Sequence, residues 1–212
     1  VKDGEWLVGY GIGTGSFGAF RRPATVKAVL QPDGRVLLQC SVNDMGPGTA
    51  TMMASIASDA LGIEPEKITI QLGSTGFPPG PMQGGSAVTA SVGSAVHDVC
   101  IAVKDRIAEF ATKAGSGFSA SGGVKATDLE VAGYGISLKN KGSVKATYAD
   151  LFHQNNLTAL EITKESAGKE QPYSSYSYSV HFVKLRVHPP TGRVKIDHVV
   201  SCADAGTIVS PK

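Results

Sequence analysis

The chain has little cysteine and no long apolar run. Three of its 212 residues are cysteine, at positions 40, 100 and 202, and no Cys-x-x-Cys pair occurs, which argues against a cysteine metal site. Their wide spacing favours three buried free thiols over a disulfide. No apolar run approaches the roughly 20 residues that a membrane span needs, and no signal peptide is recognisable.

Charge is also nearly balanced. Lys and Arg number 20 against 18 for Asp and Glu, and the basic residues are scattered, with no run beyond Arg21-Arg22. This excludes a basic stripe for nucleic acid and a polybasic patch for a membrane surface, so we expect neither partner. Hydrophobic residues make up 42%, enough for the core of one large domain or two small ones.

Three familiar catalytic or binding patterns are missing. No Gly-x-Ser-x-Gly occurs to anchor a hydrolase triad. The literal G-x-G-x-x-G at Gly13–Gly18 is followed by Arg21-Arg22-Pro23 and a strand, whereas a dinucleotide site needs a helix there. The histidines form no i, i+4 pair and lie far in sequence from the cysteines, so a histidine metal site is not expected; they are His97, His153, His181, His188 and His198.

The first half of the chain has regular elements. Two Val- and Leu-rich strands, 25–31 and 36–42, flank the turn Pro32–Arg35 and predict a hairpin. Apolar residues at helical spacing predict a helix over Thr49–Leu61, and Gly62 stands where a helix C-terminus favours glycine. A short strand over 67–72 follows.

A Gly/Pro-rich loop and a second helix complete this half. The loop, Gly73–Ser86, has 14 residues with five glycines and three prolines, and loops of this kind are usually functional or disordered. The helix is predicted over 86–114. Its first part, Ala87–Ala95, has many small residues, and we expect that face to be exposed in the isolated chain.

The second half begins after the Gly/Ser-rich joint 115–123 (GSGFSASGG). Strands are predicted over 124–131, 135–139, 157–163, 174–187 and 193–203, with a short helix over 148–154. Hairpin, helix, strand and helix in succession predict an α+β fold of mixed sheets layered with helices.

Two strand-to-helix corners carry the functional signal. The first, Asn43–Thr49, opens one helix, and the loop Gly73–Ser86 opens the other. Free amides and the positive end of the helix dipole favour anions at such corners. Between Ser41 and Ser86 only Lys67 is basic, so binding would use amides and hydroxyls. In the alternative interpretation, the glycines only form turns, and Thr49 and Ser86 are ordinary caps.

The corners also carry a family resemblance. The sequence resembles the molybdopterin-binding region of xanthine dehydrogenases and aldehyde oxidoreductases over nearly its whole length, with the bacterial aldehyde-oxidising branch most similar. The matching segments are Gly11–Gly13, Thr25–Leu30, Asp33-Gly34, Asn43–Thr49 with Thr51, Leu61–Ile63, Ile68, Gly84–Ser86, Thr89–Gly93, Ala95-Val96, Tyr178, Phe182, Val187, Thr191-Gly192, Val194, and Asp204–Gly206 with Pro211.

The resemblance implies a molybdenum hydroxylase. Its large subunit binds molybdenum on a molybdopterin, in bacteria usually the cytosine dinucleotide, and hydroxylates an aldehyde or an N-heterocycle with oxygen from water. Electrons pass to an iron–sulfur subunit and to an FAD subunit or another acceptor. The subunit repeats a strand-hairpin, helix, strand and helix unit. The chain would hold a lead-in segment, 1–23, a first molybdopterin-binding repeat, 24–114, the linker 115–123, and a second, incomplete repeat, 124–212.

The resemblance also implies particular cofactor-binding residues. The first group is Gly46, Pro47, Gly48 and Thr49. Pro47 stands where the family often has a glutamine, and it offers neither a side-chain donor nor a backbone N–H. The second group is Gly85, Ser86, Ala87 and Val88, with Val88 standing where the family often has a hydroxyl.

Catalytic residues are not expected in this chain. The family's glutamate base follows the Asp-x-Gly segment matched at Asp204, and its substrate segment precedes the matched region. Because Val1 is not a start methionine, we expect a central piece of a longer subunit whose other repeats complete the site. The piece alone should be inactive and free of cofactor. A non-catalytic scaffold on the same fold and an unrelated anion-binding domain are the alternatives; the bacterial cytoplasm and periplasm both stay open.

Overall fold

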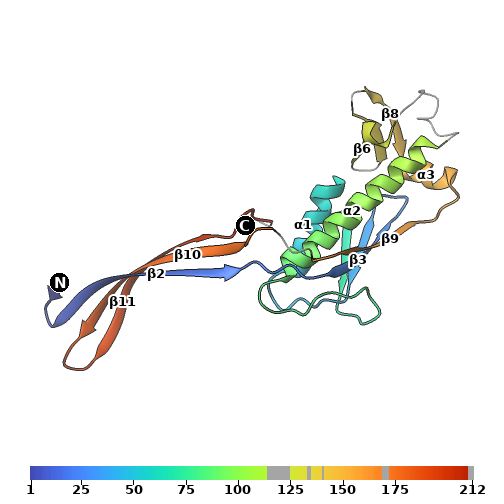
Figure 1. Cartoon of the computed structure of the whole chain (residues 1–212). Helices are drawn as coiled ribbons and strands as arrows, with labels where there is room; N and C mark the ends of the chain where they lie inside the picture. The colour runs from blue at the N-terminus through green and yellow to red at the C-terminus, as the bar shows by residue number, and fades with distance from the viewer. Residues whose placement is uncertain (114–124, 133–134, 140, 169–171, 210–212) are drawn as a thin grey trace. The chain divides into compact units, whose positions relative to one another are not determined.

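The computed structural model describes residues 1–113, 125–132, 135–139, 141–168 and 172–209. It confirms a mixed α+β fold, with three sheets and three α-helices in the described residues (Figure 1). In chain order the elements are β1 (Lys2–Asp3), β2 (Trp6–Gly18), β3 (Ala24–Leu30), β4 (Val36–Cys40), α1 (Thr49–Leu61), the 3-10 turn Pro65–Lys67, β5 (Ile68–Leu72), α2 (Val88–Thr112), the 3-10 turn Ala126–Asp128, β6 (Leu129–Ala132), β7 (Gly135–Leu138), β8 (Lys141–Thr147), α3 (Tyr148–Gln154), β9 (Leu160–Ser166), β10 (Tyr176–His188) and β11 (Arg193–Asp204).

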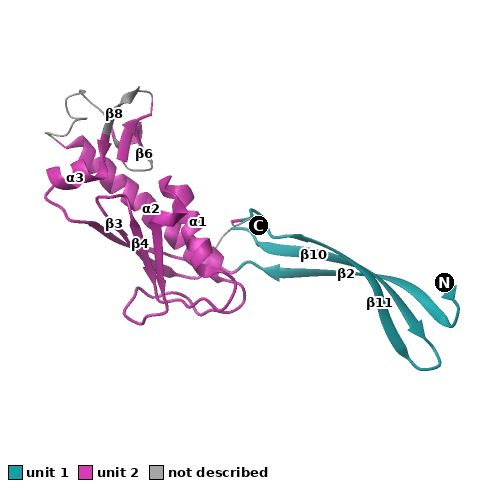
Figure 2. Ribbon diagram, turned by 180° about the vertical axis from the view of Figure 1, so that it is seen from behind, with its two compact units in different colours: residues 1–19, 171–208 teal, residues 20–170, 209–212 magenta. Residues whose placement is uncertain are grey.

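The chain forms two compact units (Figure 2). The first contains residues 1–19 and 171–208 and is an antiparallel sheet in the order β1-β2-β10-β11. At its centre Phe182 of β10 pairs with Ile12 of β2 on one side and with Val200 of β11 on the other. The strand β2 was not predicted from the sequence, where residues 1–23 were expected to be a lead-in segment.

The first sheet has a strand face without side chains, on β2, and an edge strand, β11. Every second residue from Gly9 to Gly15 of β2 is glycine, so one face of that strand is bare backbone. A Cβ added at Gly11 or Gly13 would meet nothing within 4 Å. Among the strands that the structure describes, β11 pairs only with β10 and is therefore an edge strand. Large apolar side chains are exposed on this unit, including Tyr10 and Ile196.

The second unit holds the main core. Its sheet has the order β5-β4-β3-β9, with β4 and β5 parallel and the other pairs antiparallel. Alternate residues of β3 and β4 are fully buried, as expected for strands covered on one face. The helices α1 and α2 lie together over the sheet (Figure 1). The largest side chains of this core are Tyr148, Phe152, Leu30, Leu38, Met53, Leu61, Ile63, Ile107 and Leu151.

A small third sheet, β6-β7-β8, belongs to the same unit and leads into α3. The helix starts with a capping box in which Thr147 and Asp150 exchange side-chain-to-backbone hydrogen bonds. Its apolar residues, among them Leu151, are buried in the main core. The predicted helix over 148–154 is confirmed, since cap and apolar spacing agree.

The helix α1 is confirmed at both ends, and Gly62 has the left-handed φ of 64° that ends it. The helix α2 begins two residues later than predicted, because Gly85 and Ser86 have φ of 66° and 55°. The expectation that its small-residue face is exposed is wrong. Ser91 and Gly93 are buried, and a Cβ at Gly93 would lie 2.8 Å from Cδ1 of Ile56. Small residues there let α1 approach closely.

The loop from Gly73 to Ser86 is held at its centre. The carbonyl of Pro78 accepts from the Ser41 amide and that of Pro79 from the Thr25 amide, each at 2.9 Å. The amide of Gly80 donates to Oγ of Ser41 at 3.0 Å. A Cβ at Gly80 would overlap the side chain of Val42. The loop therefore packs along the ends of the β3–β4 hairpin, which its composition did not indicate.

Several other expectations have outcomes here. Cys40 and Cys100 are buried free thiols, but Cys202 is exposed on β11, so the prediction of three buried thiols is wrong for that residue. Among the described residues, no helix is both long and apolar enough to cross a membrane. The expected linker, 115–123, lies outside the described residues. The strand β9 pairs with β3 rather than within the second half. The two compact units are defined by contacts, whereas the repeats 24–114 and 124–212 were expected from the family resemblance. The boundaries of the repeats therefore stay a prediction.

Candidate cofactor-binding site

In the corner before α1, the amides bind a carboxylate of the chain itself. The carboxylate of Asp44 accepts hydrogen bonds from the amides of Gly46 (3.0 Å), Gly48 (3.3 Å) and Ala50 (3.4 Å). These bonds, that of Gly46 foremost, lower the pKa of Asp44 from its ordinary 3.8. The amides that the sequence suggested for an external anion are therefore largely engaged by a side chain of the chain itself.

At the same corner the side chain of Thr49 is buried without a partner. Gly48 is the N-cap residue, with a left-handed φ of 81°, and Thr49 is the first residue inside the helix. Thr49 is only 2% exposed, and its Oγ1 has no hydrogen-bond partner among the described residues. Pro47, just before, has no N–H to offer. The corner therefore leaves one buried hydroxyl unsatisfied.

The corner before α2 is electrostatically different. Among the described residues, none accepts a hydrogen bond from the amides of Gly85, Ser86 or Ala87. Ser86 is exposed, whereas the side chain of Ala87 is fully buried. No carboxylate engages these amides, so this corner keeps the donors that a helix N-terminus offers to an anion.

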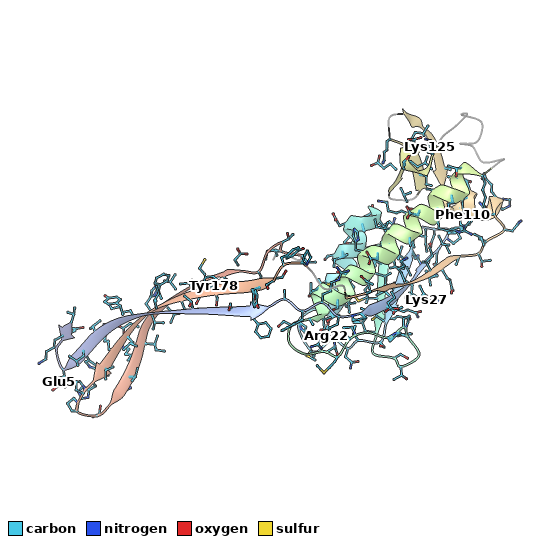
Figure 3. All side chains as sticks on the ribbon, in the orientation of Figure 1. Glu5, Arg22, Lys27, Phe110, Lys125 and Tyr178 are labelled. Carbon is cyan, nitrogen blue, oxygen red and sulfur yellow. The ribbon has the colours of Figure 1, made fainter. Side chains whose placement is uncertain are left out.

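A cation lies beside the second corner. The amide of Arg22 donates to Oγ of Ser91 at 2.8 Å, and Oγ of Ser91 donates to the carbonyl of Ala87 at 2.7 Å. The guanidinium of Arg22, labelled in Figure 3, reaches the carbonyl of Met82 at 3.4 Å. Arg22 thus ties the segment before β3 to the start of α2 and places its guanidinium at Met82, in the loop that leads to α2.

The two corners meet in one hollow of about 350 Å³. Five of the eight residues predicted for the cofactor line it: Pro47, Gly48, Thr49, Ser86 and Val88. The other three, Gly46, Gly85 and Ala87, belong to the corners but do not line it. None of the lining side chains is ionisable; the further members are Met45, Met52, Gln83 and Thr89.

Gln83 and Thr89 are polar lining residues that were not predicted from the sequence, and Gln83 connects the two corners. It stands in the loop before α2, and its Nε2 donates to the carbonyl of Asn43 in the first corner. This bond connects the two corners directly and leaves the Gln83 carbonyl oxygen as an acceptor. A single glutamine in a Gly/Pro-rich loop forms no recognisable motif. The only signal in the sequence was that Gln83 lies in a loop predicted to be functional.

The glycine-rich run at residues 13–18 and the histidines form no second site in the described part of the chain. The G-x-G-x-x-G of residues 13–18 lies inside β2, and no helix follows it. His188 contacts Trp6, Thr191 and Glu5, and His181 contacts Ser179 and Ser201. In the part of the chain that the structure describes, no three His, Cys, Asp or Glu residues gather as a metal site would require.

Comparison with known proteins identifies the family of this chain. The model of the molybdopterin cofactor-binding domain matches residues 2–212. The chain therefore belongs to that family, the class of domain that holds the molybdenum cofactor of molybdenum hydroxylases.

Two curated relatives show how much of such a subunit the chain spans. It is 28% identical over 212 residues to the aldehyde oxidoreductase molybdenum-binding subunit PaoC of Escherichia coli K12, covering all of this chain and 27% of that protein. It is 26% identical over 213 residues to the nicotine 6-hydroxylase large subunit of Paenarthrobacter nicotinovorans, covering 93% and 24%. The chain thus spans about a quarter of the length of these relatives.

Solved structures share the fold. The Cu,Mo-CO dehydrogenase superposes with a TM-score of 0.79 at 21% identity, over 98% of this chain and 27% of that one. Quinoline 2-oxidoreductase from Pseudomonas putida 86 superposes with a TM-score of 0.81 at 16% identity, over 97% and 28%. The folds therefore agree although few residues are identical.

Proposed function

We propose that this chain forms one wall of the molybdenum cofactor site in a larger oxidoreductase subunit. The observation that carries the proposal is the hollow in which both predicted corners meet. The family match over residues 2–212 supports it from an independent direction. The parent enzyme would oxidise aldehydes or hydroxylate N-heterocycles with water as the oxygen source, in line with relatives named for an aldehyde and for nicotine.

The residues of the hollow fit such a group. A buried hydroxyl without a partner at Thr49, the exposed Ser86 and the unengaged amides of the second corner are donors for an oxygen- and nitrogen-rich ligand. The apolar walls at Pro47 and Val88 exclude water around it. Gly46, Gly48, Gly85 and Ala87 would hold the backbone of the two corners in position. When bound, the cofactor supplies the redox-active molybdenum that takes electrons from the substrate.

The chemistry beyond positioning is assigned to other parts of the parent. No base is proposed in this chain, because the family's glutamate falls outside the matched segments. Electrons would leave through an iron–sulfur subunit and an FAD subunit or another acceptor, and the cofactor would be the cytosine dinucleotide form. The isolated chain would turn over neither aldehydes nor purines with an artificial acceptor, and it would purify without cofactor, because one wall buries little of the ligand.

The test is a charge placed in the hollow. Val88 is the first residue of α2 and lines the hollow, and an aspartate there favours the helix start while repelling an anionic ligand. In the parent enzyme, Val88→Asp should lower molybdenum and pterin per chain about tenfold, equivalent to about 1.4 kcal/mol of binding free energy. The neutral, similarly sized Val88→Asn is the matched control and should lose much less. Equal losses in both variants would show that the hollow holds no anionic cofactor.

A non-catalytic scaffold on the same fold is the second candidate. The observation that favours it is Pro47, which removes both a backbone and a side-chain donor from the first corner. Metal analysis of the parent, produced in a host that makes the cofactor, separates the two functions. Molybdenum near one per chain supports the enzyme, and its absence supports the scaffold.

A further inference from the structure

The edge strand β11 is exposed along its length, together with its large apolar side chains (Figure 2). Asp197 is half-buried, and every other residue of the strand is exposed. Val194, Ile196, Val199 and Val200 are each between 49% and 63% exposed. The outer backbone N–H and C=O groups of such a strand can form a ladder with another strand. The outer side of β11 is therefore an interaction surface.

The charges of β11 indicate which strand fits this surface. Arg193 and Lys195 stand at its start, and Asp204 is its last residue. The salt bridges of the described residues involve neither Arg193 nor Asp204. Antiparallel pairing of two copies places the basic start of one strand against the acidic end of the other. The outer edge of β2 over Gly9–Gly18 has no charged residue and lacks this complementarity to itself.

A bulge in β11 affects the registers that such a pair can adopt. On the ladder with β10, Lys184 pairs with His198, but Leu185 pairs with Ile196. Asp197 is thus an extra residue that opposes no residue of β10, as in a β-bulge. In an antiparallel pair, directly opposite residues must lie on the same face of the sheet. The bulge must therefore be left out when residues of two copies of β11 are matched.

One register matches the two copies over the whole strand. It has Val199 on a two-fold axis, and it places Arg193 of each copy opposite Asp204 of the other. These two residues share a face, because they pair with His188 and Tyr178 of β10, which are an even number of residues apart. Moving the axis along the strand leaves one end unpaired and separates Arg193 from Asp204. Strand length and charge therefore select the same register.

We propose that two copies of this chain pair antiparallel through β11, with Val199 on the two-fold axis, and join their four-stranded sheets into one. Backbone hydrogen bonds between the two edges hold the pair together, and an Arg193–Asp204 ion pair at each end selects the register. Because pairing of two strand edges buries little apolar surface, the dimer dissociates on dilution. The inference does not depend on the proposed function.

A disulfide across the two-fold axis tests the register. In a Cys202→Ser background the remaining cysteines, Cys40 and Cys100, are buried. Val199→Cys places two thiols opposite each other at a Cα separation of about 4.5–5.5 Å, which a disulfide spans. Val200→Cys is the matched control, since Val200 is 50% exposed and Val199 is 49% exposed. Its two copies lie diagonally at about 7–8 Å, which is too far.

With oxidised glutathione as the oxidant, Val199→Cys should become mostly covalent dimer, and Val200→Cys should stay mostly uncrosslinked. Non-reducing electrophoresis measures both. Equal cross-linking of the two variants would show contact without the proposed register and would overturn the proposal.

A charge exchange tests the ion pairs. Arg193→Asp and Asp204→Arg each place like charges opposite one another at both ends of the dimer. Each variant alone should therefore raise the dimer Kd about tenfold, as measured by sedimentation equilibrium. An equal mixture of the two variants restores opposite charges at both ends and should dimerise as tightly as the wild type. This recovery also shows that neither substitution acts by unfolding the chain.

The wild type gives the remaining outcomes. It should dimerise reversibly, and salt at about 1 M, where the Debye length is about 3 Å, should reduce the effect of both charge variants. A wild type that stays monomeric at its highest soluble concentration would overturn the proposal, and so would association that dilution does not reverse. A dimer whose Kd neither charge variant changes would show that another surface pairs.

Discussion

The two helix starts of this chain look alike in sequence and are opposite in charge. Each follows a glycine-rich corner and each was expected to bind an anion through its amides. At α1 the Asp44 carboxylate engages the amides of Gly46, Gly48 and Ala50. At α2 no described residue engages the corresponding donors, and Arg22 lies beside the loop. A glycine-rich helix start is thus an anion site only when the chain does not supply the anion itself.

The largest effect is expected from a change in the loop that leads to the second corner. Gly80 anchors the loop that leads to α2, and a Cβ there would overlap Val42 and lie 3.1 Å from Sγ of Cys40. Gly80→Ala should lower the free energy of unfolding by about 1–3 kcal/mol, the usual range for overpacking. Denaturant titration measures it. Gly76→Ala, in the same loop with its nearest neighbour at 3.6 Å, is the control and should change little.

A smaller effect is expected from removing the internal anion of the first corner. Asp44→Asn keeps the size of the side chain but weakens its bonds to the three amides, so the melting temperature should fall. It should also make the two corners more alike. Sulfate should then raise the melting temperature of Asp44→Asn more than that of the wild type. Equal responses to sulfate would show that Asp44 does not decide where anions bind.

The same residue gives a pH dependence with a defined sign. The pKa of Asp44 is lowered in the folded chain, chiefly by the Gly46 amide. Its stabilisation is therefore fully present above its ordinary pKa of 3.8 and is lost as the pH falls through the lower folded value. The stability difference between wild type and Asp44→Asn should stay constant near neutral pH and shrink below about pH 4. A difference that grows on acidification would contradict this.

The smallest effect on stability is expected from substituting Ser86 in the second corner. Ser86 has a left-handed φ of 55°, which glycine adopts without strain. Ser86→Gly should raise the free energy of unfolding of the chain by up to about 1 kcal/mol, while removing a hydroxyl from the hollow. Ser86→Pro, whose ring fixes φ near −65°, should instead disrupt the corner. Thermal melts of both variants would check the direction, and a stabilised proline variant would show that the corner is not left-handed.

What the sequence predicted depended on how local the signal was. The helix α1 was placed at both ends because apolar spacing and Gly62 lie within one segment. The strand β2 was missed because half of its central residues are glycine and its partner β10 lies at the other end of the chain. The small residues of α2 were recognised, but a stripe of small residues does not indicate which element packs against it. In the structure α1 packs there, with Ile56 against Gly93.

The candidate site followed the same rule. Both corners were found from glycine and proline, and five of the eight proposed residues line the hollow. The sequence indicated only weakly that Asp44 would bind the amides of the first corner: an aspartate stands two residues before a glycine. The contributions of Gln83 and Arg22 had none, because each depends on a bond to a segment distant in sequence, Asn43 and Ser91 respectively.

The glycine face of β2 has a consequence for how the chain behaves before it is fully folded. Register between strands is normally enforced by side chains that must reach the correct face, and over residues 9–15 β2 has side chains on one face only, among them Tyr10 and Ile12. A slip by two residues moves each of these glycines to the place of the next one, so the bare face of β2 looks the same to β10 after the slip. On the other side of β10, β11 is an edge strand of 12 residues that no further described strand covers, so this sheet is where refolding chains should pair with one another. Yield of soluble chain should therefore fall steeply with concentration during refolding.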